Sequence, residues 1–187
     1  PRSTSHVEKD KFVILYTGML HKQFGILNLI SAVHQIPDKD IELHLCGYGD
    51  ALTEINSMAE TDPRVKYLGV VSRDKALEEQ TKASLLVNPR IPDNNPFTKY
   101  SFPSKTLEYL ASGTPTLLYK LDGIPEEYYD YCYSIGPENT DVVSLVNAIV
   151  KIKNKPQEEI SNMGKRARSF VINNKNSIVM SSYIVDL

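Results

Sequence analysis

Two short apolar runs, at residues 85–87 and 116–118, constrain the fold more than any other feature of the sequence. Each run is continuous and does not alternate with polar residues, which is typical of a strand that is covered on both faces. Strands of that kind occur in parallel sheets, whose crossover connections place helices on either side. The two runs therefore predict an α/β protein.

Strand and helix signals alternate along the rest of the chain. Apolar runs predict strands at 12–16, 41–46, 65–68, 85–87, 116–118 and 131–135. Apolar residues at helical spacing predict the intervening helices, with Ser72 and Thr140 as caps of two of them and Ile160, Met163, Ala167 and Phe170 inward in the last. This alternation predicts a Rossmann-like, doubly wound parallel sheet of about six strands with helices on both faces.

The length suggests one domain with a substantial core, since 187 residues lie within the usual size of a domain. We expect a linker or fragment boundary at residues 1–11, because that segment is polar and has no periodicity. The folded domain is expected at 12–173 and a helical tail at 174–187.

Composition disfavours several classes of protein. The formal net charge is -2 and no basic run is long enough to follow a phosphate backbone, which argues against a general nucleic-acid binder. Cys46 and Cys132 are far apart and match no disulfide or metal framework, as expected of a cytoplasmic protein. No stretch approaches the roughly 18 apolar residues of a membrane span, so we expect no intrinsic membrane segment.

The long loop and the helix start between the two central runs form the candidate site. We expect the helix to be capped by Ser104 and to end at Gly113. Its free amides would attract an anion such as phosphate, and Lys105 would add a full positive charge. Glu108 shares a helix face with Lys105 and is well placed for sugar hydroxyls. An ordinary surface ion pair between Lys105 and Glu108 would explain these two residues equally well.

Glycines follow three of the predicted strands, at Gly18, Gly47, Gly49 and Gly69. In a doubly wound sheet, ligands bind beyond the carboxyl ends of the strands. Glycine at such a turn lets backbone amides approach a phosphate with no side chain in the way. The turns lack the third glycine of the dinucleotide fingerprint, which disfavours a nicotinamide-dependent enzyme.

Three segments, YTGMLHKQFGILNLI, LHLCGYGD and SFPSKTLEYLASGTP, together resemble the C-terminal, donor-binding half of a GT-B glycosyltransferase of family 4, of the bacterial capsule and surface-polysaccharide type. The resemblance extends from about Phe12 to Phe170. It implies that the chain is one lobe of a GT-B enzyme. Such an enzyme transfers a sugar from a nucleotide-sugar donor to a hydroxyl acceptor with retention of configuration, and it uses no metal or other cofactor.

The resemblance also implies a role for each candidate residue. Lys105 and Glu108 would have catalytic roles. The donor diphosphate would be bound by Gly18, Lys22, Ser104, Lys105 and Thr106, with Gly47 and Gly49 in a turn near the phosphates. The nucleobase and ribose would be bound by Gly69, Val70, Val71 and Glu108, and the donor sugar by Tyr100, Ser101 and Phe102.

The chain departs from the family pattern at three places. Met19 and Phe24 stand where the family usually has an arginine and a lysine, and Lys22 would supply the charge from a shifted position. Tyr100 stands near the usual place of a glutamate, and its phenol can form a hydrogen bond but cannot supply negative charge at neutral pH. These departures leave open a non-catalytic sugar-nucleotide-binding module. A GT-B-fold sugar-nucleotide epimerase is a further alternative.

The expected partners are a nucleoside-diphosphate sugar and a sugar or lipid-linked glycan acceptor. The acceptor would be bound mainly by an N-terminal lobe that this sequence lacks, so we expect the fragment to be inactive alone. We expect the full-length protein to be cytoplasmic, with peripheral association at the inner face of the membrane as a further expectation.

Overall fold

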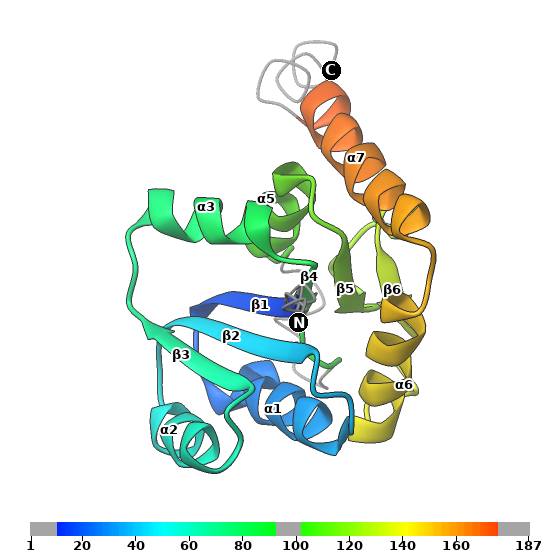
Figure 1. The fold of residues 1–187 in the computed structure, drawn as a ribbon. Coiled ribbons are helices and arrows are strands. Elements are labelled where there is room, and N and C mark those ends of the chain that lie inside the picture. Colours follow the sequence, from blue (N-terminus) through cyan, green and yellow to red (C-terminus); the bar gives the residue numbers. More distant parts are fainter. Residues whose placement is uncertain (1–10, 93–101, 176–187) are drawn as a thin grey trace, which may run out of the picture.

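The computed structural model describes residues 11–92 and 102–175. In this part of the chain, six strands form one parallel sheet in the order β3-β2-β1-β4-β5-β6 (Figure 1). The strands are β1 (Phe12–Met19), β2 (Ile41–Tyr48), β3 (Val65–Gly69), β4 (Leu85–Asn88), β5 (Thr116–Tyr119) and β6 (Tyr133–Ile135). The order reverses between β1 and β4, as in a doubly wound fold. The predicted fold class is confirmed.

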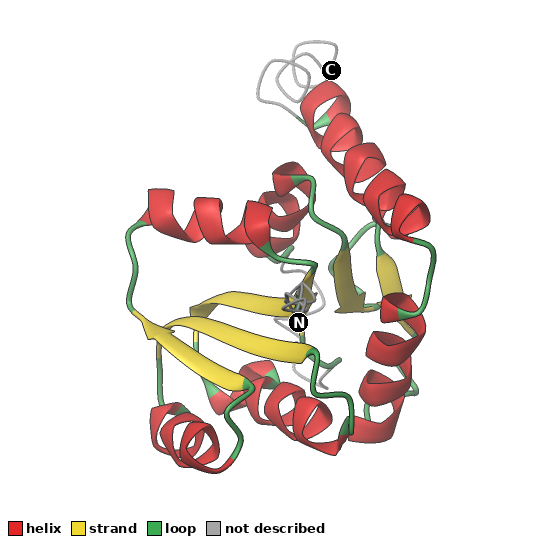
Figure 2. Cartoon of the chain, in the orientation of Figure 1, coloured by secondary structure: helices red, strands yellow, loops and turns green. Residues whose placement is uncertain are grey.

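Helices cover both faces of the sheet (Figures 1 and 2). On one face lie α1 (Ile26–Gln35), α2 (Leu52–Thr61) and α6 (Val142–Lys153). On the other lie α3 (Arg73–Lys82), α5 (Ser104–Ser112) and α7 (Gln157–Asn174). Two short 3-10 helices, η1 (Lys22–Phe24) and η2 (Glu126–Tyr131), precede α1 and β6. The candidate site lies where α5 meets the carboxyl ends of the central strands.

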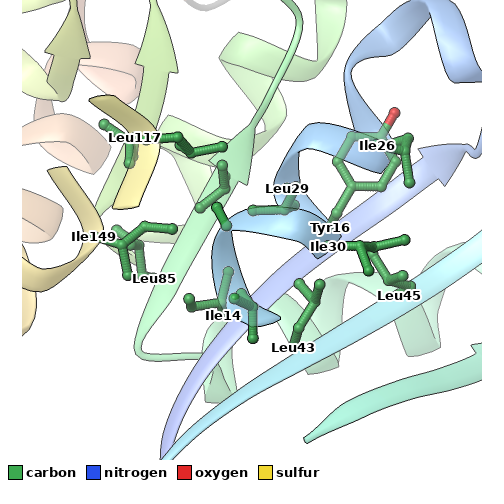
Figure 3. Packing of buried hydrophobic residues seen from close by; sticks show 14 of the residues in the cluster. Ile14, Tyr16, Ile26, Leu29, Ile30, Leu43, Leu45, Leu85, Leu117 and Ile149 are labelled. Carbon is green, nitrogen blue, oxygen red and sulfur yellow. The ribbon is translucent and has the colours of Figure 1, made fainter. Parts of the chain in front are cut away.

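The side-chain alternation of β1 explains why its apolar run is continuous. Ile14 and Tyr16 belong to the largest core cluster, which lies between the sheet and the helices α1 and α6 (Figure 3). Leu15 points to the opposite face, where it packs with Leu86 and Tyr109. Successive strand residues point to opposite faces, and both faces of this strand are covered. Ile14, Leu15 and Tyr16 are therefore all buried, whereas Phe12 and Val13 at the start of the strand are half-buried.

Three strand boundaries differ from those expected by two residues or more, and β3, β4 and β5 each end one residue later than expected. β1 and β2 continue to Met19 and Tyr48 because the strands stay paired through their glycines, Gly18 against Gly47. The predicted sixth strand at 131–135 is two residues shorter, because residue 131 ends η2 and β6 begins at Tyr133.

Two predicted helix caps are wrong by one residue. Pro103 occupies the N-cap position of α5 and its carbonyl accepts from the Thr106 N–H at 2.8 Å, so Ser104 is the first helical residue and caps nothing with its side chain. At α6, Asp141 accepts from the Ser144 N–H at 2.9 Å and takes the place predicted for Thr140.

Other helix predictions are confirmed. Ser72 caps α3 by accepting from the Lys75 N–H at 3.2 Å, and Gly113 ends α5. In α7 the buried residues include Gly164 in place of the predicted Met163. A Cβ at Gly164 would lie 2.0 Å from the Gly113 carbonyl oxygen, so the end of α5 approaches α7 at the glycine and not at the methionine.

A buried ion pair before β3 joins α1 to the end of α2. Arg64 donates to both carboxylate oxygens of Asp62, at 2.9 Å from Nε and 2.7 Å from Nη2. Its Nη1 also donates to the carbonyls of Ile36 at 2.5 Å and Asp38 at 3.1 Å. These hydrogen bonds from Arg64 lower the pKa of Asp62 to about 2. The ion pair therefore contributes to the free energy of unfolding, and this contribution decreases when acid protonates Asp62.

We expect Asp62→Asn to remove this dependence. A carboxyl whose folded pKa is depressed stabilises the fold above its unfolded pKa of about 3.9, and the contribution is lost as the pH falls toward the folded value. Here the contribution is on the order of 2 kcal/mol. Urea unfolding at about pH 5.5 should therefore separate the variant from the natural chain more than at about pH 2.5. The exposed Asp130→Asn is the control, and an equal separation at both pH values would contradict the prediction.

Candidate functional site

The carboxyl ends of β1, β2 and β3 and the start of α5 converge where the strand order reverses between β1 and β4. In doubly wound sheets this switch point is where ligands bind. Gly18 and Gly47 lie one residue before the ends of β1 and β2, and Gly69 is the last residue of β3. Three of the predicted glycines therefore lie at the same edge of the sheet.

Gly18 and Gly47 have close neighbours that the side chain of any other residue would overlap. They are register partners, with φ angles of 135° and 136° that favour glycine. A Cβ on Gly47 would lie 1.7 Å from the Gly18 carbonyl oxygen. A Cβ on Gly18 would lie 2.7 Å from both Cε and Nζ of Lys105. The ammonium of Lys105 therefore sits directly over the end of β1.

Two tyrosine rings flank the ammonium of Lys105. Its Nζ lies 5.8 Å from the ring centroid of Tyr16 and 5.3 Å from that of Tyr109. Burial lowers the pKa of Lys105, and the charge of Glu108 opposes this shift. A partly desolvated cation next to the free amides of a helix start is suited to binding an anion.

Glu108 lies one turn further along α5 and is half-buried. Its Oε1 accepts from Nε2 of Gln80 at 2.7 Å, and the same amide nitrogen donates to Oγ1 of Thr17 at 3.0 Å. Gln80 belongs to α3 and Thr17 to β1, so three elements meet at this carboxylate. The hydrogen bond of Glu108 therefore goes to Gln80, and the simple surface pair with Lys105 is not what the structure shows.

Tyr109 joins α5 to β1 behind these groups. Its side chain is fully buried, its hydroxyl accepts from the Thr17 N–H at 2.9 Å, and it donates to the Thr17 carbonyl at 3.3 Å. Burial raises the pKa of Tyr109, and it raises that of Tyr16 to about 12. Both phenols therefore stay neutral, and Tyr109 joins α5 to β1 without adding charge.

An open groove of about 560 Å³ adjoins Glu108 between α3, α5 and α7. Arg73 and Leu77 line it from α3, Ser104 and Leu107 from α5, and Arg168 from α7. Glu108 also lines it. The carboxylate thus lies between a buried donor, Gln80, and a space that a ligand can enter.

Lys22 has a different neighbour from the one its predicted role implies. Its ammonium forms an ion pair with Glu54 of α2, and its backbone N–H donates to Oδ1 of Asp50 at 2.8 Å. The hydrogen bond to Glu54 raises the pKa of Lys22. Binding of a diphosphate by Lys22 remains a prediction, and it would compete with this ion pair.

The other predicted residues have varied environments. Ser104 is exposed at the first position of α5, whereas Thr106 is 1% exposed and points into the interior. Val70 is 69% exposed beyond Gly69, and Val71 is half-buried. Gly49 lies against the Leu20 carbonyl, which a Cβ would approach to 2.2 Å.

The predicted sugar-binding residues are only partly described. Phe102 packs on Tyr128, with ring centroids 5.2 Å apart, at the edge of a second core cluster that includes Leu110 and Phe170. Tyr100 and Ser101 lie outside the described residues.

Sequence reasoning missed Gln80, Thr17, Tyr16 and Tyr109. Tyr109 follows Lys105 by four positions, so helical spacing was a signal that could have found it. Gln80 lies in the polar segment RDKALEEQTK, whose pattern gives no sign that one polar residue is buried. Only the packing of α3 on β1 and α5 shows its place.

Within residues 11–92 and 102–175, no group of three or more histidine, cysteine, aspartate or glutamate side chains is placed to hold a metal ion. None of the helices in the described ranges combines the length and apolar character needed to cross a membrane.

Residues 11–155 match the family model described as glycosyl transferases group 1. The chain belongs to the glycosyl transferases group 1 family. A comparison of this glycosyltransferase domain with curated proteins found no match.

Solved structures share the fold of this glycosyltransferase domain. Alr3699/HepE of Anabaena, in complex with UDP and glucose, is 17% identical with a TM-score of 0.73, over 95% of this chain and 48% of that one. Sucrose-phosphate synthase of Thermosynechococcus elongatus is 22% identical with a TM-score of 0.73, over 94% of this chain and 45% of that one. The C-terminal domain of the group 1 protein LpcC of Francisella tularensis is 12% identical with a TM-score of 0.67, over 88% and 86%.

The glycosyltransferase domain therefore spans less than half the length of the first two of these structures and most of the third. At these identities the likeness shows the fold. The six-stranded parallel sheet with helices on both faces matches the lobes of GT-B glycosyltransferases.

Proposed function

We propose that this domain binds a nucleoside-diphosphate sugar and presents it for transfer to a hydroxyl acceptor with retention of configuration. The observation that supports this most is the ammonium of Lys105 over Gly18 at the start of α5, with Glu108 one turn away. Structures of the same fold were solved with UDP and with UDP-glucose. We assign the domain to GT-B family 4, in capsular or surface polysaccharide biosynthesis.

In this proposal, Lys105 and the free amides at residues 104 and 105 bind the donor diphosphate. Pro103 has no N–H and the Thr106 N–H is used within the turn, so among the described residues the amides of 104 and 105 are the ones at the helix start without a backbone partner. Gly18 leaves room for the Lys105 side chain over the end of β1, and Gly47 and Gly49 let the neighbouring backbone pack closely beside it. The positive charge of Lys105 stabilises the negative charge of the departing diphosphate. Because the hydrogen-bond donors are already in place, they do not have to reorient during the reaction.

Glu108 accepts hydrogen bonds from the ribose hydroxyls, and the base lies against Val70 and Val71 beyond Gly69. The exposed face of Val70 suits contact with a flat ring. The donor sugar lies toward residues 100–102. Transfer then breaks the bond from the anomeric carbon to the diphosphate oxygen and forms one to the acceptor oxygen, whose proton passes to the departing diphosphate, with the acceptor held by a facing lobe. No metal takes part in this scheme.

Calorimetric titration of the chain with UDP, GDP and ADP, and with their glucose conjugates, tests the proposal. One base should bind saturably, and Glu108→Ala should weaken it by about tenfold, as expected for loss of a hydrogen bond to a charged group. The exposed Glu60→Ala on α2 is the matched control. Absence of binding by every member at millimolar concentration would contradict the proposal. Product analysis of a protein that also contains the facing lobe, without an acceptor, separates transfer from epimerisation, which needs none.

A further inference from the structure

Helix α3 has a single buried residue within its described span, and that residue is a glutamine. Gln80 is 0% exposed. A buried amide is unfavourable unless its polar atoms are hydrogen-bonded, and an apolar residue of similar size would avoid that requirement. The position of Gln80 therefore needs an explanation other than core packing.

Within the part of the chain that the structure describes, both hydrogen bonds of the Gln80 side chain come from its NH₂ group. One hydrogen goes to Oγ1 of Thr17 at 3.0 Å and the other to Oε1 of Glu108 at 2.7 Å. A carboxylate can only accept, so the NH₂ and not the carbonyl must face Glu108. The carbonyl oxygen, Oε1 of Gln80, is buried without a partner among the described residues. The amide therefore serves as a donor pair, and this arrangement is not the best one for stability alone.

The backbone around Gln80 is held as firmly as its side chain. Thr114 is 5% exposed, and its Oγ1 donates to the backbone carbonyl of Gln80 at 2.6 Å. Thr17 is in turn bonded to Tyr109 through its backbone N–H. The donor pair is thus anchored to the entry of β5 on one side and to β1 on the other.

We propose that Gln80 is a positioning residue, which holds the Glu108 carboxylate in the orientation that accepts hydrogen bonds from both ribose hydroxyls of the donor nucleotide. This rests on the ribose role of Glu108 in the proposed function. Gln80 occupies one carboxylate oxygen from the buried side, so the ligand binds from the groove side. It also keeps Glu108 from turning toward Lys105, where it would neutralise the cation that the diphosphate needs.

The test is the preference for a ribonucleotide over its 2′-deoxy form. UDP and 2′-deoxy-UDP are titrated into the natural chain and into Gln80→Met, which keeps the length of the side chain and removes the donor. The natural chain should prefer UDP by about tenfold, and Gln80→Met should reduce the preference to about twofold or less. Inorganic pyrophosphate, which reports on Lys105 and the helix start, should bind both proteins equally. GDP and ADP with their deoxy forms are titrated in parallel.

Gln80→Glu gives a readout that a purely structural role would not change. When protonated, the introduced carboxyl group donates an O–H to Glu108 as the amide does. When ionised, it repels Glu108, and burial beside a like charge raises the pKa of the pair. The ribonucleotide preference should therefore be retained near about pH 6 and lost near about pH 9. In Gln80→Met the ribonucleotide preference should be weak at both pH values.

Other charged groups near Glu108 are accounted for in the same series. Lys105 lies on its own helix, and Arg73, Arg168 and Lys175 line the groove from α3 and from α7 and its C-terminal end. Because burial lowers the pKa of Lys105, its titration is followed by the affinity for pyrophosphate over the same pH range. The Tyr16 and Tyr109 phenols, whose pKa values are raised, stay neutral.

The outcomes separate the two proposals. If Glu108→Gln loses the ribonucleotide preference but Gln80→Met and Gln80→Glu keep it at every pH, the positioning role is wrong and the proposed function stands. If Glu108→Gln keeps the preference, the ribose role of Glu108 fails and the inference fails with it. Binding of none of the three nucleotides overturns the proposed function itself.

Discussion

Lys105→Met should weaken nucleoside-diphosphate binding by about 10- to 100-fold and raise the free energy of unfolding of the unliganded domain. The binding loss follows from the position of the ammonium over Gly18 at the start of α5. A charge-assisted hydrogen bond contributes about 1.5–3 kcal/mol, and every 1.4 kcal/mol is about tenfold in affinity. Binding of uridine, which lacks the phosphates, should change much less.

The gain in stability follows from the direction of the pKa shift. Burial lowers the pKa of Lys105, so the folded state binds this proton less tightly than the unfolded state. At a pH below both the folded and the unfolded pKa the cost is present in full, and methionine removes it while filling the same space. As the pH rises through the folded pKa, the natural chain loses this cost and the two proteins should converge.

Titration with UDP and urea unfolding at neutral pH measure the two effects. Lys120→Met is the matched control, because Lys120 also lies over a ring, 4.8 Å from the centroid of Tyr129, but belongs to a different part of the fold. Unchanged UDP affinity in Lys105→Met would show that the anion site lies elsewhere. A lower free energy of unfolding would show that the contacts of Lys105 with Tyr16 and Tyr109 outweigh the cost of its burial.

Gly47→Ala should destabilise the domain by roughly 2–6 kcal/mol, as the sum of a strained φ and an overpacked contact. The Cβ would lie 1.7 Å from the Gly18 carbonyl oxygen, and that atom belongs to the backbone of the paired strand. A flexible side chain could move aside, but a central strand cannot move without breaking its hydrogen bonds. Relief would require separation of β1 from β2 at the candidate site.

Gly69→Ala is the control for the strain alone. Its φ of 80° also favours glycine, but no atom lies within 4 Å of the place its Cβ would take. This variant should lose about 1–2 kcal/mol. Urea unfolding of both variants separates the two causes. Equal losses would mean that the clash at Gly47 is relieved cheaply and that the glycine is required only for its conformation.

Most of the fold was predictable because its signals are local. Continuous apolar runs and helical stripes identified the strands and helices that the structure shows, and the glycine after α5 marked its end. The errors fall where neighbours decide. Pro103 and Asp141 hold the cap positions predicted for Ser104 and Thr140, and Gly164 is buried where Met163 was expected to face inward. The caps are local hydrogen bonds that either of two adjacent residues could make, whereas the burial of Gly164 depends on the approach of the end of α5.

The candidate site was predictable only in outline. Lys105 and Glu108 were identifiable because both lie at a helix start that follows a central strand. Their neighbours were not, since Gln80 of α3 and Thr17 of β1 come from segments far away in the chain. Lys22 likewise has a sequence context that suggests a phosphate, while Glu54 of α2 binds its ammonium in the structure.

The sequence by itself determined the parallel sheet, because a strand that is apolar at every position must be covered on both faces, and the alternation with helices provides that cover. It also determined that a cation and a carboxylate share the first turns of one helix. Only the tertiary structure decided how they are oriented. A hydrogen bond between distant segments depends on packing and leaves no pattern in either segment, so the link from Gln80 to Glu108 appears only when α3, α5 and β1 are brought together.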